Sequence, residues 1–153
     1  ESKTLVQLIR RTLEKASVGP EDVGYINAHG TGTEQNDLVE MRGIRTALGQ
    51  AADQVAVSAS KSMIGHLVNA AGGVELAITV LAQRDGYAPP TINLNDIDPA
   101  CTFDCVPLTG KKVNFEYAIK LSVAFGGHLV GILLRRWNDV ASGFAYPADR
   151  RAA

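Results

Sequence analysis

The chain has 153 residues, of which 46% are hydrophobic and 20% are charged, and its formal net charge is −1. This composition is typical of a globular domain with an apolar core and excludes a disordered chain. Because there is no basic tract, neither nucleic acid nor an anionic membrane is an expected partner. Cys101 and Cys105 are too few for a secreted disulfide framework, so we expect a reducing, cytoplasmic location.

The first residues are polar, with no signal peptide and no initiating methionine, so we expect the chain to begin partway through a longer protein. Residues 5–13 repeat apolar side chains at helical spacing, and Gly19-Pro20 ends that helix. The apolar run Val23–Asn27 predicts a short strand. Residues Glu34–Leu48 predict a second helix with an apolar inner face.

A glycine-rich turn, Asn27-Ala-His-Gly-Thr-Gly-Thr-Glu-Gln-Asn-Asp37, joins this strand to the second helix. Strand-to-helix turns place side chains at the carboxyl edge of a sheet, where α/β proteins build their sites. His29 ends the strand, and Thr31 and Thr33 carry hydroxyls that can bond an amide or a phosphate. Taken alone, these residues fit plain turn chemistry equally well. A dinucleotide fingerprint is disfavoured because Gln35 stands where its third glycine belongs.

The middle of the chain predicts a second strand at residues 55–58 and a long helix, His66–Gln83. Because that helix is apolar nearly all round, we expect it to be buried between layers. Its centre, Ala70–Gly73, is thin, and two glycines in a helix cost about 1 kcal/mol each, so we expect another backbone to pack closely there. Lys61, in the motif Lys-Ser-Met-Ile-Gly-His66, is by itself best interpreted as a solvated lysine. Polar interruptions rule out a membrane span.

The last third predicts an extended loop followed by a hairpin. Residues 84–90 break the helical pattern, residues 89–99 are extended, and residues 112–115 predict an edge strand. Tyr117–Ala124 and Leu129–Leu134 are strand-like, and the paired glycines of Phe125-Gly-Gly-His128 suit a tight turn with positive φ. The element order predicts an α/β domain over residues 1–137, with a mixed sheet flanked by helices. We expect residues 138–153 to form a partly disordered surface tail.

The three motifs HGTGT…ND, KSxxGH and FGG occur in this order, and the chain resembles the C-terminal half of an elongating β-ketoacyl-acyl-carrier-protein synthase of the thiolase superfamily. The resemblance covers about residues 6–136. It implies a thiolase-like fold in which two pseudo-symmetric halves pack together, this chain being the second. It also implies chain extension by decarboxylative Claisen condensation with malonyl-acyl carrier protein, in fatty acid or polyketide synthesis. No cofactor is implied beyond the carrier's pantetheine arm.

The resemblance also implies roles for individual residues. His29 and His66 would donate hydrogen bonds to an oxygen on which negative charge develops. Lys61 would be the cation that keeps their rings neutral. Phe125 would gate the site and offer its backbone N–H to the oxyanion hole. The residues expected to bind substrate are Thr31, Thr33, Gly126 and Gly127.

Two acidic residues, Asp37 and Glu40, lie three positions apart and share a helix face. The resemblance implies that this face reaches toward Lys61, whereas acidic residues favoured by the helix dipole explain them about equally well. We interpret His128 as structural. A metal site built from the three histidines is disfavoured, because its ligands would come from three distant turns without characteristic spacing.

The chain departs from the family pattern at Leu121 and Leu129, which replace two asparagines around the gate. Cys101 and Cys105 lie in an extended acidic segment without a neighbouring base, so we assign neither as the nucleophile. The active cysteine is expected in an N-terminal half, and the chain alone should be inactive. In the full enzyme we expect a homodimer or heterodimer. Two alternatives remain: a non-catalytic partner subunit like a chain-length factor, disfavoured by the retained histidines, and a stand-alone binding module.

Overall fold

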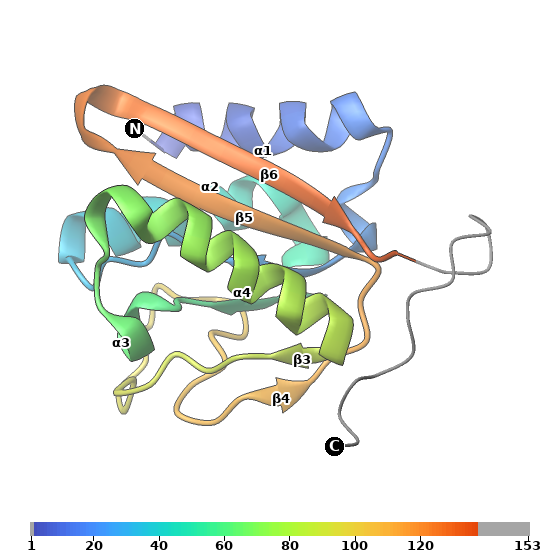
Figure 1. Ribbon diagram of the computed structural model, residues 1–153. Coiled ribbons are helices and arrows are strands. Elements are labelled where there is room, and N and C mark those ends of the chain that lie inside the picture. Colours follow the sequence, from blue (N-terminus) through green and yellow to red (C-terminus); the bar gives the residue numbers. More distant parts are fainter. Residues whose placement is uncertain (1, 138–153) are drawn as a thin grey trace, which may run out of the picture.

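The computed structural model describes residues 2–137, in which a four-stranded sheet carries helices on both faces (Figure 1). Short 3-10 turns, η1 to η4, connect several of the elements. In chain order the helices and strands are α1 (Ser2–Ala16), β1 (Val23–Asn27), α2 (Glu34–Leu48), β2 (Ala56–Ser58), α3 (Lys61–Ile64), α4 (Ala71–Asp85), β3 (Tyr87–Ala88), β4 (Lys111–Lys112), β5 (Tyr117–Ala124) and β6 (His128–Arg135).

The strands of the main sheet lie in the order β2-β1-β5-β6. Strand β1 runs parallel to both of its neighbours, and Asn27 at its end pairs with Ser58 of β2 and Lys120 of β5. Strands β5 and β6 are antiparallel and meet at the turn η4 (Phe125–Gly127), where Gly126 and Gly127 have φ of 78° and 81°. The expected mixed sheet and the glycine hairpin turn are therefore both confirmed.

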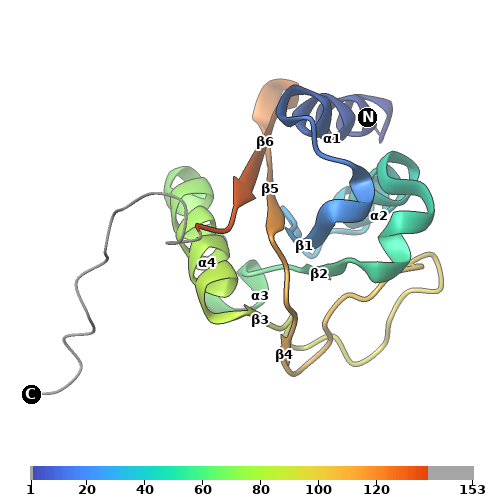
Figure 2. The ribbon, with the colours of Figure 1, turned by 90° about the vertical axis from the view of Figure 1, so that its right-hand side faces the viewer.

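One face of the sheet is covered by α1 and α2 (Figure 2). A Cβ on Gly43 of α2 would lie only 2.7 Å from Leu5 Cδ2, so glycine allows the two helices to approach closely. The core on this face is apolar throughout, as expected from the helical spacing of leucine and isoleucine. Its fully buried members include Leu5, Ile9, Leu13, Ile26, Ile44, Leu48, Ile119 and Leu121.

The opposite face is covered by α4, which lies apart from α1 and α2 across the sheet (Figure 2). Glu75, Thr79 and Gln83 are buried, whereas Val80 and Leu81 are 47% and 46% exposed. Within residues 2–137, α4 is therefore covered on one side only: it turns polar groups toward the sheet and leaves apolar groups exposed on the other side.

The start and centre of α4 differ from the expectation. The helix begins at Ala71 rather than His66, because Gly65 has φ of 74° and Val68 has φ of 49°, which turn the chain before the helix starts. Apart from the adjacent residues and the backbone of α4 itself, no described atom lies within 4 Å of a Cβ built on Gly73, and the nearest to one on Gly72 is Ser122 Oγ at 3.6 Å. The expected close backbone approach is therefore absent from residues 2–137.

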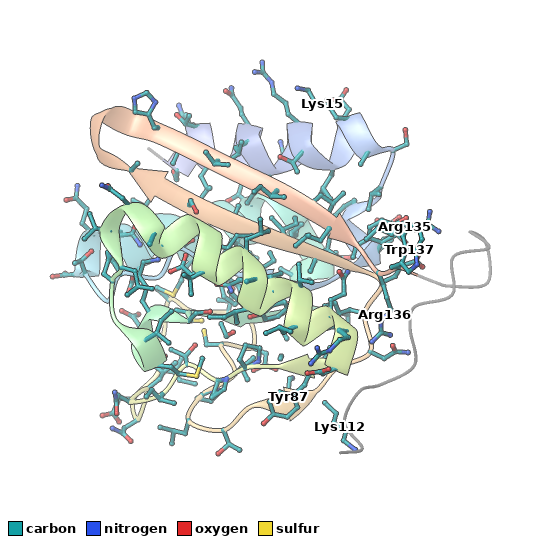
Figure 3. All side chains as sticks on the ribbon, viewed as in Figure 1. Lys15, Tyr87, Lys112, Arg135, Arg136 and Trp137 are labelled. Carbon is teal, nitrogen blue, oxygen red and sulfur yellow. The ribbon has the colours of Figure 1, made fainter. Side chains whose placement is uncertain are left out.

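A small second sheet pairs β3 with β4, in which Tyr87 lies beside Lys112 (Figure 3). The edge strand expected at residues 112–115 is thus shorter and starts one residue earlier, at Lys111. No helix among residues 2–137 has the length and apolar character needed to cross a bilayer. The tail expected at residues 138–153 lies outside the described residues.

Candidate active site

The turn after β1 is held by the acidic residues of α2. The Glu40 carboxylate accepts hydrogen bonds from the backbone N–H groups of His29 (2.6 Å) and Gly30 (2.8 Å), and Asp37 accepts one from Gly32 (3.3 Å). Gly30 has φ of 47°, and a Cβ there would lie 2.3 Å from the Cβ of Ala59, so only glycine fits. Burial raises the pKa of Glu40, an effect that the two backbone hydrogen bonds oppose.

His29, in the turn directly after β1, is buried, and Lys61 contacts one of its ring nitrogens. The Lys61 ammonium donates to the His29 carbonyl at 2.5 Å and lies 3.3 Å from ring Nδ1. An ammonium has no acceptor, so Nδ1 must accept, and the ring proton of neutral His29 is on Nε2. Burial, followed by the charges of Lys61 and Lys120, lowers the pKa of His29 to about 4. The ring is therefore neutral at physiological pH.

His66 lies in the exposed turn that follows α3. Its Nδ1 accepts a hydrogen bond of 3.0 Å from the backbone N–H of Val68, so a neutral ring carries its proton on Nε2. The ring centroids of His29 and His66 are 5.6 Å apart and the ring planes meet at 85°. Two histidines far apart in the sequence are thus brought together, as we expected, and each has an Nε2–H donor.

The carboxylate that contacts Lys61 is Glu75 of α4, so the expectation that Asp37 and Glu40 reach Lys61 was wrong. The Lys61 ammonium is 2.5 Å from Glu75 Oε1, and the Lys120 ammonium of β5 is 2.7 Å from Oε2. All three side chains are buried. Sequence reasoning missed Glu75 and Lys120, although each is a charged residue flanked by apolar residues, in the first half of α4 and in the middle of β5.

The turn after β1 separates two hollows in the surface. A pocket of about 390 Å³ has Thr33 and Glu40 on one side and Gly126 and Gly127 of the hairpin turn on the other. The Thr31 and Thr33 hydroxyls share a 2.9 Å hydrogen bond. Three residues expected to bind substrate, Thr33, Gly126 and Gly127, therefore line one pocket, next to the backbone of Phe125.

The second hollow, of about 410 Å³, lies on the other side of this turn and includes Cys101 and Cys105. Both thiols lie near the Phe103 carbonyl, at 3.5 and 3.8 Å, and are half-buried. A hydrogen bond from Cys105 lowers the pKa of Cys101 to about 7. Histidine lines neither hollow. His128, the exposed first residue of β6, is on the hairpin. Within the described part of the chain, no three His, Cys, Asp or Glu side chains cluster as metal ligands would.

Residues 1–95 match the family described as beta-ketoacyl synthase, C-terminal domain. The chain is 49% identical to a 3-oxoacyl-[acyl-carrier-protein] synthase 2 of Vibrio harveyi, over 75% of the chain and 28% of that protein. It is 41% identical to a putative polyketide beta-ketoacyl synthase 1 of Streptomyces virginiae, over 85% of the chain and 31% of that protein.

A solved structure gives the same picture. The chain superposes with a TM-score of 0.84 and 35% identity on a chain of the AntDE:AntF complex, described as a type II polyketide synthase acyl-carrier protein with its ketosynthase bound to the hexaketide. This match covers 88% of the chain and 33% of the solved one. The chain thus spans about a third of the length of the proteins it matches.

Proposed function

The chain belongs to the C-terminal domain family of beta-ketoacyl synthases, and from this premise we propose that it supplies half of the active site of an elongating condensing enzyme. Its substrates would be an acyl chain and a malonyl group carried by acyl carrier protein. The names of its relatives include both fatty acid-type and polyketide-type synthases. The proposal therefore covers the reaction and leaves the length of the acyl chain open.

The proposed reaction begins with the acyl chain as a thioester on a cysteine of the N-terminal half. The malonyl group loses carbon dioxide when the bond between its carboxyl carbon and α-carbon breaks, and the electron pair stays on the resulting enolate. The enolate carbon then attacks the cysteine thioester, a carbon–carbon bond forms and the cysteine leaves as a thiolate. The enolate oxygen carries developing negative charge, which well-placed hydrogen-bond donors stabilise by several kcal/mol.

The observation that carries the proposal is the pairing of His29 with His66. Their rings lie 5.6 Å apart, and the Nδ1 of each is engaged, by Lys61 and by the Val68 backbone respectively. Two neutral rings of the Nε2–H form can donate to one thioester oxygen, whereas an imidazolium would instead risk transferring its proton. The low pKa of His29, about 4, keeps that donor neutral.

The substrate arm would enter through the pocket between the turn after β1 and the hairpin turn. In this proposal the hydroxyls of Thr31 and Thr33 bind the pantetheine amides, while Gly126 and Gly127 let the arm pass close to the backbone. The backbone N–H of Phe125 would serve the oxyanion hole for the acyl thioester. No cofactor is needed beyond the carrier's arm, and acyl carrier protein is the proposed partner.

The exposed apolar side chains of α3, of α4 and of the turn between them support packing against an N-terminal half. Isolated exposed apolar residues are common, but a contiguous set marks an interaction site. We propose that this surface meets the half carrying the cysteine, in a cytoplasmic dimer. Its large exposed members are Met63, Ile64, Leu67, Val68, Val74, Val80 and Leu81.

The competing function, a non-catalytic partner resembling a chain-length factor, has less support. Such a subunit has no need for two converging N–H donors. Nor does it need a buried Lys61–Glu75 pair behind them, because an ion pair in the core is weak support for stability compared with apolar packing. The presence of both histidines and of the buried Lys61–Glu75 pair favours a catalytic role.

The test compares the chain alone with the full-length protein that contains it. Labelled acyl carrier protein and malonyl carrier protein are supplied, and both enzyme acylation and product are measured. We expect no acylation of Cys101 or Cys105 by the chain alone, and condensation by the full-length protein. His66→Ala should lower condensation by about 10²–10³-fold, whereas His128→Ala, the matched histidine control, should retain it. Acylation of the isolated chain, or full activity of His66→Ala, would overturn the proposal.

A further inference from the structure

A second buried lysine lies behind the site. Lys120 occupies the middle of β5, where its backbone pairs with Asn27 of β1 and Ile132 of β6, and it is only 1% exposed. Lysine is almost never fully buried unless it is paired. Its neighbours in the strand, Ile119 and Leu121, are apolar core residues, so the sheet itself does not require a charge at this position.

The contacts of Lys120 join it to His29 through two intermediates. Its ammonium is 2.7 Å from Glu75 Oε2, and the other oxygen of that carboxylate is 2.5 Å from the Lys61 ammonium. Lys61 in turn holds both the carbonyl and the Nδ1 of His29. Lys120 also donates to the Leu121 carbonyl and lies 3.5 Å from that of Ala28, directly before His29. Each member of the series comes from a different part of the fold: β5, α4, α3 and the turn after β1.

The charges in this cluster disfavour protonation of His29. Two ammonium groups share one carboxylate, so the side of His29 that faces α3 and α4 carries an excess positive charge. A third cation there would meet two others in a buried setting, which disfavours it. Burial and the charges of Lys61, Lys120 and His66 all lower the pKa of His29, and Glu75 raises it. On the α2 side, Glu40 binds the backbone N–H of His29.

We propose that Lys120 is a positioning residue of the condensing site: through Glu75 and Lys61, it holds the His29 ring neutral with its Nε2–H free to donate. If Lys120 were absent, Glu75 would pair with Lys61 alone, and the excess positive charge beside His29 would disappear. The catalytic consequence rests on the proposed function, whereas the effect on the His29 ring does not.

The first test measures the His29 ring directly. Histidines of the full-length protein are labelled with ¹⁵N and titrated by NMR without substrate, and His29 is assigned by the signal missing from His29→Gln. We expect His29 to titrate well below 6.5 in the wild type, and Lys120→Met to raise its pKa by about one pH unit. Lys120→Arg, which keeps the charge, should leave the pKa low. Thr79→Val removes a buried hydroxyl from the same face of α4 without changing charge, and should also leave it low.

The second test follows catalysis. In Lys120→Met the acidic limb of the pH profile for condensation should move toward neutral pH by the same amount, while acyl transfer to the cysteine is unchanged. A purely structural role would lower the melting temperature without moving the limb. Unchanged His29 titration in Lys120→Met would overturn the inference. If Lys120→Met does not fold, the wild type and Lys120→Arg provide the test. A His29 pKa near 6.5 in either protein contradicts the proposal. A wild type that does not condense would refute the proposed function but leave the titration result standing.

Discussion

The two faces of the sheet are built on opposite principles (Figure 2). Helix α1 buries Leu5, Ile9 and Leu13 and leaves its charged residues in solvent, as an amphipathic surface helix does. Helix α4 does the reverse, since it buries Glu75 and leaves valine and leucine side chains half exposed. Both helices have 15 residues and pack on the same sheet, so length does not explain the difference.

The comparison separates residues that stabilise the fold from residues that serve the site. The face under α1 and α2 holds an apolar core and one buried carboxylate, Glu40 of α2, which binds backbone N–H groups, whereas the face under α4 holds two lysines and a carboxylate next to His29. Burying charges carries a desolvation cost that apolar side chains avoid. The charged face is therefore the one on which a functional requirement outweighs stability.

The largest expected effect comes from removing the shared carboxylate. Glu75→Leu leaves Lys61 and Lys120 buried without a counter-charge, which should lower the free energy of unfolding by about 3–5 kcal/mol. Urea denaturation of the protein measures the loss. The control Glu14→Leu, on the exposed side of α1, should change it by less than about 0.5 kcal/mol. A loss below about 1 kcal/mol for Glu75→Leu would mean that the ion pairs are not the counter-charges we describe.

Matched deletions on the two helices should differ by a smaller amount. Ile9→Ala opens a cavity in the core under α1 and α2 and should lower the free energy of unfolding of the isolated chain by about 3 kcal/mol. Val80→Ala, at a position 47% exposed, should cost less than about 0.5 kcal/mol there. In the full-length protein, the second change should become costly because the N-terminal half covers it. Equal costs for Val80→Ala in both settings would argue against that interface.

The third expected effect is a pH dependence of stability. Burial lowers the pKa of His29 to about 4 from 6.5, so between these values the unfolded chain binds more protons than the folded one. Stability should therefore fall as the pH falls from about 6.5 to about 4, and His29→Gln should flatten this slope. His128→Gln, an exposed control, should leave it unchanged. An identical slope in wild type and His29→Gln would show that the buried charges of this face do not lower the pKa of His29.

Most of the face under α1 and α2 was predictable from the sequence, because its helices and strands follow from local periodicity. The helical repeat of residues 5–13 predicted α1, and the paired glycines of Phe125–His128 between two strand-like runs predicted the β5–β6 hairpin. The pairing of His29 with His66 followed from a resemblance of motifs, since neither spacing nor periodicity brings them together. Sequence patterns therefore suffice where the fold follows the usual rule of apolar side chains inward.

The charged face under α4 was predicted less well because its features depend on tertiary packing. The start of α4 was placed at His66, since the positive φ of Val68 leaves no signature in a run of apolar residues. The partner of Lys61 was sought in the acidic residues after the first motif, which instead bind backbone N–H groups. The role of Glu75 depends on tertiary packing, because it is the folded chain that brings α4 beside Lys61 and Lys120.

The central claim is that His29 and His66 form a pair of Nε2–H donors, and histidine tautomers measure it most directly. At pH 7, ¹⁵N NMR of the histidine-labelled full-length protein distinguishes imidazolium, Nδ1–H and Nε2–H rings. We predict that His29 is neutral and that both rings, in their neutral form, carry the proton on Nε2, because Lys61 and the Val68 backbone engage their Nδ1 atoms. An imidazolium signal from His29, or an Nδ1–H ring at either position, would contradict the account.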